Sequence, residues 1–68
     1  MAKGLTLRAA RVNANLTQKE LADRLGVDRT TIVAWENGNT KIKTAYLIAF
    51  CEVCGVSTDD IVLPTKST

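Results

Sequence analysis

The apolar residues of this 68-residue chain recur at helical spacing, and glycines or short polar segments divide them into five stretches. Leu7, Ala10 and Ala14, for example, form one apolar stripe near the N-terminus. The pattern fits helices throughout and no strand. We therefore predict an all-α fold with helices at residues 6–14, 17–25, 28–36, 44–54 and 58–63.

Capping residues and glycines mark the helix boundaries. Thr17 and Glu20 have the spacing of a capping box, in which the hydroxyl and the carboxylate each accept a backbone N–H of the other residue. Gly26 supplies the left-handed residue that ends this helix, and Val27 follows as its apolar contact. The same reasoning assigns the other helix starts to Asp28, Thr44 and Ser57, and the other helix ends to Gly38, Gly55 and Pro64.

The stretch from Thr17 to Gly38 holds two helix starts and two helix ends within 22 residues. Helices joined by so short a connector cannot pack as long antiparallel rods, so we expect them to cross. A crossed pair leaves the second helix standing out from the body of the domain. That geometry suits insertion of a helix into a DNA groove.

Helical geometry gives the third predicted helix an inner face around Ile32 and an outer face. The outer face consists of Arg29, at the edge of the first turn, with Thr30, Val33 and Ala34. Small and apolar side chains are unusual on the solvated face of a helix. They allow close approach to a base edge or to the methyl group of thymine.

Glu36 falls on the inner side of the same helix, where a carboxylate needs a partner. Arg11 lies beside the apolar stripe of the first helix and is the best candidate. We predict a largely buried Arg11–Glu36 ion pair. The alternative is that the Glu36 side chain extends to water.

The fourth predicted helix is apolar almost all round, with Glu52 as its only charged residue. One stripe of this helix, formed by Leu47, Phe50, Cys51 and Cys54, is expected to face the core. A helix that is also apolar elsewhere is covered on more than one side. We therefore predict a protein interface on Tyr46, Ile48, Ala49 and Val53. The alternative is that Tyr46 and Ile48 pack on the fifth helix and on the 37–43 loop.

Positive charge is concentrated in the part of the chain with the crossed helices. Residues 1–43 hold eight Lys/Arg and four Asp/Glu, a balance of +4, whereas residues 44–68 hold one and three, a balance of −2. A polyanionic partner is the natural reading, with ordinary surface charge as the alternative. No apolar run reaches the length of a membrane span and no secretory segment begins the chain, so we expect a cytoplasmic protein without a membrane partner.

The sequence offers little for catalysis, metal binding or a cofactor. The chain has no histidine, and its two cysteines, Cys51 and Cys54, supply half of a zinc site at most. They fall near a helix C-terminus, where the dipole disfavours a thiolate, so we interpret them as small buried hydrophobes. Asp59 and Asp60 fit the start of a helix better than an acid–base pair. We predict no catalytic residue, no metal and no cofactor.

Several short motifs together are specific, although none is so alone. They are Leu16-Thr17-Gln18, Glu20-Leu21-Ala22, Leu25-Gly26-Val27, Thr31-Ile32, Trp35-Glu36-Asn37-Gly38 and Gly55-Val56-Ser57. With these motifs the chain resembles the lambda-repressor-like helix-turn-helix family of the Cro/C1 type over roughly Leu7 to Leu63. The resemblance implies a compact five-helix bundle whose third helix enters the major groove of double-stranded DNA.

The resemblance also implies residue roles. Base contacts fall on Arg29, Thr30, Val33 and Ala34, with a phosphate contact as the alternative for Arg29. Backbone contacts fall on Thr17, Gln18, Thr31, Asn37, Asn39, Lys41 and Lys43. Gln18 matches a residue that typically touches phosphate and braces the first recognition residue. Arg11 and Glu36 match the family's buried salt bridge.

We therefore predict a non-enzymatic, sequence-specific regulator of phage or bacterial origin, resembling a stand-alone Cro-like repressor and acting as a homodimer on DNA. Residues 1–64 are expected to form the DNA-binding domain and residues 65–68 a flexible tail. The alternative function is an antirepressor that binds a partner repressor protein. The apolar outer face of the fourth helix and the small net charge of +2 favour it.

Overall fold

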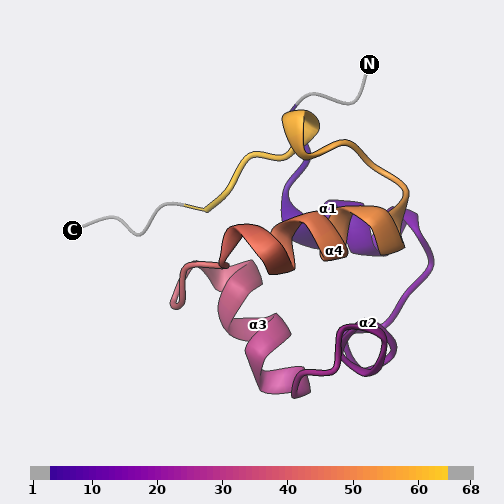
Figure 1. Ribbon diagram of the computed structural model, residues 1–68, viewed down its shortest axis with the longest axis vertical. Coiled ribbons are helices and arrows are strands. Elements are labelled where there is room, and N and C mark those ends of the chain that lie inside the picture. The colour runs from indigo at the N-terminus through magenta and orange to yellow at the C-terminus, as the bar shows by residue number, and fades with distance from the viewer. Residues whose placement is uncertain (1–3, 65–68) are drawn as a thin grey trace.

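A computed structural model describes residues 4–64; the tail predicted at 65–68 lies outside the described residues. Four α-helices and one turn of 3-10 helix follow one another along the chain, and no strand is formed within the described range (Figure 1). The elements are α1 (Leu7–Asn13), α2 (Gln18–Leu25), α3 (Arg29–Asn37), α4 (Thr44–Cys54) and η1 (Thr58–Asp60). The all-α class predicted from the sequence is confirmed.

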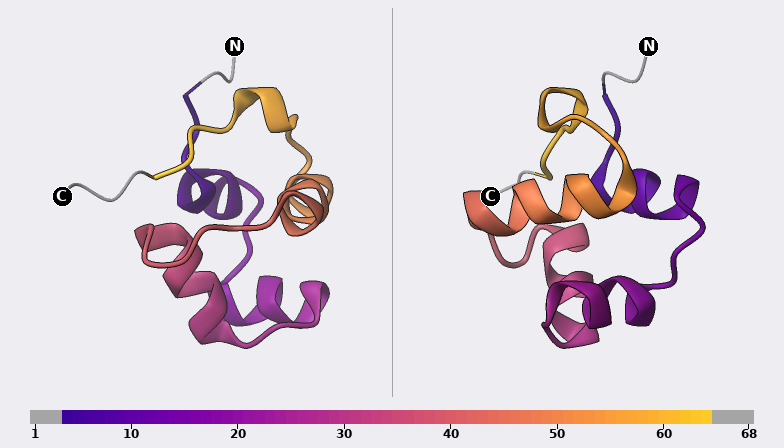
Figure 2. Two further views of the ribbon diagram at one scale, coloured as in Figure 1. Left: turned by 60° about the vertical axis from the view of Figure 1, so that its left-hand side comes forward. Right: turned by 45° about the vertical axis from the view of Figure 1, so that its right-hand side comes forward.

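The helices surround one apolar core. α1 and α4 lie next to each other, with α2 and α3 on the other side of the core (Figures 1 and 2). The largest fully buried side chains come from all four helices: Leu7, Leu21, Ile32, Phe50 and Cys51. Because so small a domain buries a limited share of its surface, each of these side chains contributes substantially to its stability.

The prediction of a fifth helix at 58–63 is wrong, because only a turn of 3-10 helix, η1, forms there, over Thr58–Asp60. Ile61 is already extended, with φ −89° and ψ 133°, and forms a parallel bridge with Leu5. The backbone N–H of Val62 donates to the Leu5 carbonyl at 2.7 Å. Two β-branched residues disfavour the helix, Pro64 disfavours helical Leu63, and pairing with the N-terminal segment supplies the backbone hydrogen bonds instead.

The capping predictions are confirmed at α2 and at Ser57, whose hydroxyl accepts the Asp59 N–H at 3.2 Å, and are wrong in part at α3 and α4. At α2, Thr17 Oγ1 accepts the Glu20 N–H at 3.0 Å and Glu20 Oε1 accepts the Thr17 N–H at 2.8 Å. Asp28 is the N-cap residue of α3 but makes no side-chain capping bond, so its stabilising effect is that of charge at the helix start. Thr44 is the first helical residue of α4, and the N-cap position belongs to Lys43.

Replacing Thr17 with alanine is expected to lower the free energy of unfolding by about 1 kcal/mol, because the first turn of α2 loses its capping bond. A melt followed by circular dichroism should shift down by roughly 4–8 °C. Thr30→Ala, at an exposed threonine without a capping role, is the control and should melt close to the parent. Equal melting temperatures for the two variants would show that the capping box does not contribute to the stability of the fold.

Acid should weaken the same box. The Thr17 backbone N–H, and then its hydroxyl, lower the pKa of Glu20 below its ordinary value. A carboxylate with a lower pKa in the folded state stabilises the fold at neutral pH and loses that effect as the pH falls through this lowered pKa. The difference in stability between the parent and a Glu20→Ala variant, which lacks the titrating carboxylate, should therefore shrink in acid.

Candidate nucleic-acid interface

A three-residue connector sets the crossing of α2 and α3. Gly26 adopts a left-handed conformation with φ 71° and ψ 32° and ends α2. The Val27 N–H then donates to the Ala22 carbonyl at 3.0 Å, and the Val27 side chain packs against the core. This tight turn is why α3 runs across α2 and projects at the edge of the domain (Figure 1).

The outer face of α3 is accessible. Ile32 and Trp35 are buried, with 0% and 5% of their surface exposed, and anchor the helix to the core. The four residues predicted to contact bases remain on the surface: Arg29 and Thr30 are exposed, and Val33 and Ala34 are half-buried. Thr31, predicted to contact the DNA backbone, is half-buried beside them. The sequence-predicted ridge is thus brought together on one side of one helix.

A buried ion pair underlies this ridge. Arg11 Nε lies 2.6 Å from Glu36 Oε2, and Arg11 Nη2 donates to Glu36 Oε1 at 3.3 Å. The two side chains are only 10% and 4% exposed, so Glu36 does not extend to water. Arg11 Nη1 also donates to the Leu16 carbonyl at 2.9 Å, which ties α1 to the segment before α2. This pair links three parts of the domain through charge-assisted hydrogen bonds.

Gln18 joins the ion pair to the recognition face. Its Nε2 donates to Glu36 Oε1 at 3.1 Å, and its Oε1 accepts from Arg29 Nη1 at 2.9 Å. A carboxylate can only accept, so Glu36 fixes which end of the Gln18 amide faces it. The carbonyl oxygen of Gln18 is therefore directed at Arg29, whose guanidinium can only donate. Sequence spacing alone did not indicate this chain of contacts, because it depends on side-chain conformations in three helices.

A polar hollow of about 320 Å³ opens beside the start of α2. It is lined by Arg8, Arg11, Thr17, Gln18, Glu36 and Asn37. Two arginines face one carboxylate there, and the first N–H groups of α2 add positive potential, so the hollow favours an anion. Arg8 could not be predicted from the sequence, because an exposed arginine on a short helix carries no signal until the fold places it with Gln18 around one hollow.

The α3–α4 loop adds further positive charge to the molecule. Of the residues predicted to contact the DNA backbone in this region, Asn37, Asn39, Lys41 and Lys43 are all exposed. Loop cations of this kind bind phosphates without reading sequence. Within residues 4–64, neither lysine takes part in an ion pair, so both ammonium groups are available.

The exposed apolar surface on the outer face of α4 is smaller than expected. Val53 packs partly against the core and Ala49 is half-buried, so these two residues expose less apolar surface than expected. Tyr46 and Ile48 remain 38% and 49% exposed. The Tyr46 ring contacts Trp35 of α3, with centroids 5.3 Å apart and planes at 44°, rather than a fifth helix.

The cysteines lie in the fold as the sequence suggested. Cys51 is buried and Cys54 half-buried, and both are free thiols. Burial raises the pKa of both thiols, and the neighbouring Cys51 raises the pKa of Cys54 further. Thiols of this kind are poor nucleophiles and poor metal ligands at neutral pH.

None of the described helices is long and apolar enough to cross a bilayer.

Comparison with known proteins agrees with this geometry. The sequence model of the helix-turn-helix family matches residues 7–61, so the chain belongs to the helix-turn-helix family, in its Cro/C1 type. It is 44% identical over 57 residues to an uncharacterized HTH-type transcriptional regulator of Methanocaldococcus jannaschii, covering 81% of this chain and 83% of that protein. It is 49% identical over 45 residues to an uncharacterized HTH-type transcriptional regulator of Archaeoglobus fulgidus, covering 63% of each chain. Both relatives are archaeal, whereas the resemblance had suggested a phage or bacterial protein.

Proposed function

We propose that this protein is a sequence-specific, non-enzymatic DNA-binding transcriptional regulator whose α3 enters the major groove. The observation that carries the proposal is the accessible ridge of Arg29, Thr30, Val33 and Ala34 on a helix that projects from the domain. A protruding helix of this width fits the major groove, where base edges are distinguishable. The archaeal relatives named as transcriptional regulators support the same conclusion.

Each part of the ridge has a distinct role in this proposal. Arg29 donates two hydrogen bonds to a guanine, and Thr30 bonds a neighbouring base edge. Val33 and Ala34 contact thymine methyl groups or allow the helix to approach closely. The loop lysines and the hollow beside Gln18 and Arg8 hold phosphates on either side and fix the register of α3.

The proposed regulator binds as a homodimer in the manner of a Cro-like repressor. The domain measures 30 × 28 × 20 Å, so one copy offers a contact too small for tight specific binding. Two copies on half-sites about 34 Å apart, one helical turn, present two recognition helices to the same side of the duplex. Their exposed Tyr46 and Ile48 offer apolar surface for contact between the copies.

Salt dependence tests the proposal. Affinity for mixed genomic DNA should fall by orders of magnitude between about 50 and 200 mM salt, because each phosphate contact releases counterions. Lys43→Gln should lower the salt slope by about one per bound copy. Arg24→Gln, in the last turn of α2 and outside the proposed contact set, should leave the slope unchanged. A folded protein that fails to bind DNA at the lower salt contradicts the proposal.

A second candidate is an antirepressor that binds a partner repressor. The exposed Tyr46 and Ile48 favour it, since apolar side chains of this size at the surface are typical of protein contacts. The salt titration separates the two functions, because an antirepressor needs no DNA affinity of its own. Substituting Ile48 with serine should weaken partner binding, while the Tyr46–Trp35 contact and the face of α3 that would meet DNA remain intact.

A further inference from the structure

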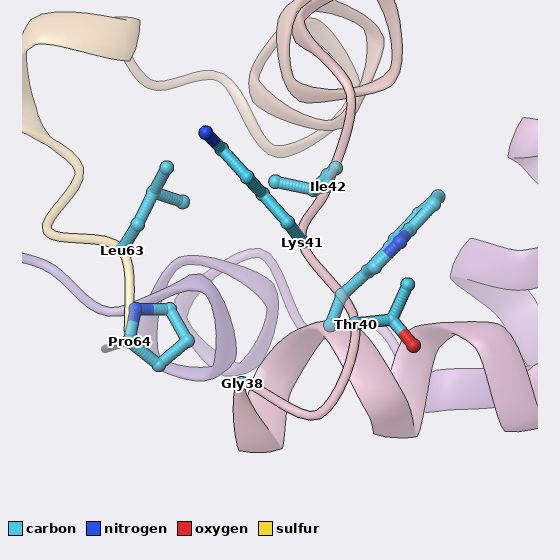
Figure 3. A pocket seen from close by; sticks show the side chains of 7 residues that line it. Gly38, Thr40, Lys41, Ile42, Leu63 and Pro64 are labelled. Carbon is cyan, nitrogen blue, oxygen red and sulfur yellow. The ribbon is translucent and has the colours of Figure 1, made fainter. Parts of the chain in front are cut away.

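A second hollow lies at the C-terminal end of α3. Its volume is about 490 Å³, and it opens between the α3–α4 loop and the extended segment that follows η1 (Figure 3). It is lined by Trp35, Gly38, Thr40, Lys41, Ile42, Leu63 and Pro64. The proposed contacts with DNA do not use its walls, apart from Lys41.

The walls are apolar and the size is that of a ligand site. Trp35 and Ile42 form the floor, each only 5% exposed, and Leu63 packs against the same core from the C-terminal segment. Gly38 closes one end, because a Cβ at this left-handed residue would lie 3.1 Å from the Cβ of Pro64. Pockets for small molecules typically measure about 300–1,000 Å³ and combine apolar walls with a few polar groups.

Lys41 determines what kind of molecule fits. Its aliphatic stem extends over the space between Ile42 and Leu63 in Figure 3. Among the described residues that line it, none is acidic and Lys41 alone carries a full charge. The pocket therefore complements a molecule with an apolar body and a single negative group.

The geometry points to a binding site for a small apolar carboxylate, such as a medium-chain fatty acid, held by these walls and paired with Lys41. The pairing of the ligand carboxylate with Lys41 also regulates DNA binding, an inference that rests on the proposed function. Lys41 belongs to the loop that meets the DNA backbone, and an ammonium paired with a bound carboxylate no longer neutralises a phosphate. Ligand and DNA thus compete for one side chain, so each lowers the affinity for the other.

Trp35 provides a direct readout, because it is the only tryptophan of the chain and lines the pocket. Octanoate, titrated below its micelle-forming concentration, should change the fluorescence of Trp35 in a saturable manner. Octanamide has the same body without the charge and should bind about threefold more weakly, the value of an exposed ion pair.

Two lysine variants of equal charge separate this site from a general effect of positive charge. Lys41→Gln should reduce octanoate affinity about threefold, to that of octanamide. Lys43→Gln removes the same charge from the same loop outside the lining and should bind octanoate as the parent does. Three results would each overturn the site. The first is a fluorescence change that is absent or does not saturate. The others are equal affinity of the parent for octanoate and octanamide, and equal losses of octanoate affinity in the two lysine variants.

The regulatory step has its own measurement. Saturating octanoate should lower the DNA affinity of the parent by about fivefold per bound copy at 0.1 M salt, the contribution of one phosphate contact, and should not affect the DNA affinity of Lys41→Gln. An unchanged DNA affinity for the parent under saturating octanoate would reject the regulation. If the protein does not bind DNA, the proposed function is wrong. The fluorescence titration is carried out without DNA, so it still shows whether the pocket binds octanoate.

Discussion

Replacing Arg11 with alanine is expected to lower the free energy of unfolding by about 3–5 kcal/mol, the cost of leaving one member of a buried ion pair alone. The Glu36 carboxylate is 4% exposed and would keep only the Gln18 amide as a partner. The Leu16 carbonyl would also lose its donor. A 68-residue domain has a total stability of roughly 3–10 kcal/mol, so this loss is a large fraction of the whole.

A thermal melt measures the effect, which should reach roughly 12 °C or more. Arg24→Ala, at an exposed arginine on α2, is the matched control and should change stability by less than about 1 kcal/mol. A double variant with methionine at both Arg11 and Glu36 should recover most of the loss, because no charge then remains buried. A melting temperature for Arg11→Ala close to that of the parent would refute the stabilising role of the pair.

Local rules explain why most helices could be predicted from the sequence. The capping box of Thr17 and Glu20 and the left-handed Gly26 act within a few residues of each other, so spacing alone locates both ends of α2. The approach of Arg11 to Glu36 could also be anticipated. Each residue lies beside the buried stripe of its own helix, and a buried carboxylate needs a cation.

Features that depend on distant segments could not be predicted in the same way. The stretch after Asp60 is extended because Ile61 pairs with Leu5 at the other end of the chain, which local propensity does not report. The bond from Gln18 to Glu36 likewise depends on how two helices cross and on side-chain rotamers. The pocket beside Lys41 combines an interhelical loop with the C-terminal segment, so no sequence motif encodes it.

Removing Arg29 is expected to relax the sequence preference of the protein at one base pair by about 1–3 kcal/mol, the worth of one bidentate contact to guanine. Operators selected from random DNA, and their single-base variants, provide the measurement. Arg29→Lys keeps the charge without the planar fork, so it should retain affinity for nonspecific DNA while losing the preference. An equal loss on all sequences, with a smaller salt slope, would instead assign Arg29 to a phosphate.

The bond from Arg29 Nη1 to Gln18 Oε1, at 2.9 Å, makes this preference depend on a residue that need not touch the base. Gln18 is itself held by Glu36, so the guanidinium is oriented before DNA arrives and less conformational entropy is lost on binding. Gln18→Ala should therefore weaken discrimination at the same base pair as Arg29→Ala. Added to Arg29→Ala, it should cause no further loss at that position. Additive losses at that base pair would show that Gln18 reads the base independently of Arg29, whereas a Gln18→Ala variant that weakens binding to all sequences equally would show that Gln18 acts on phosphate alone.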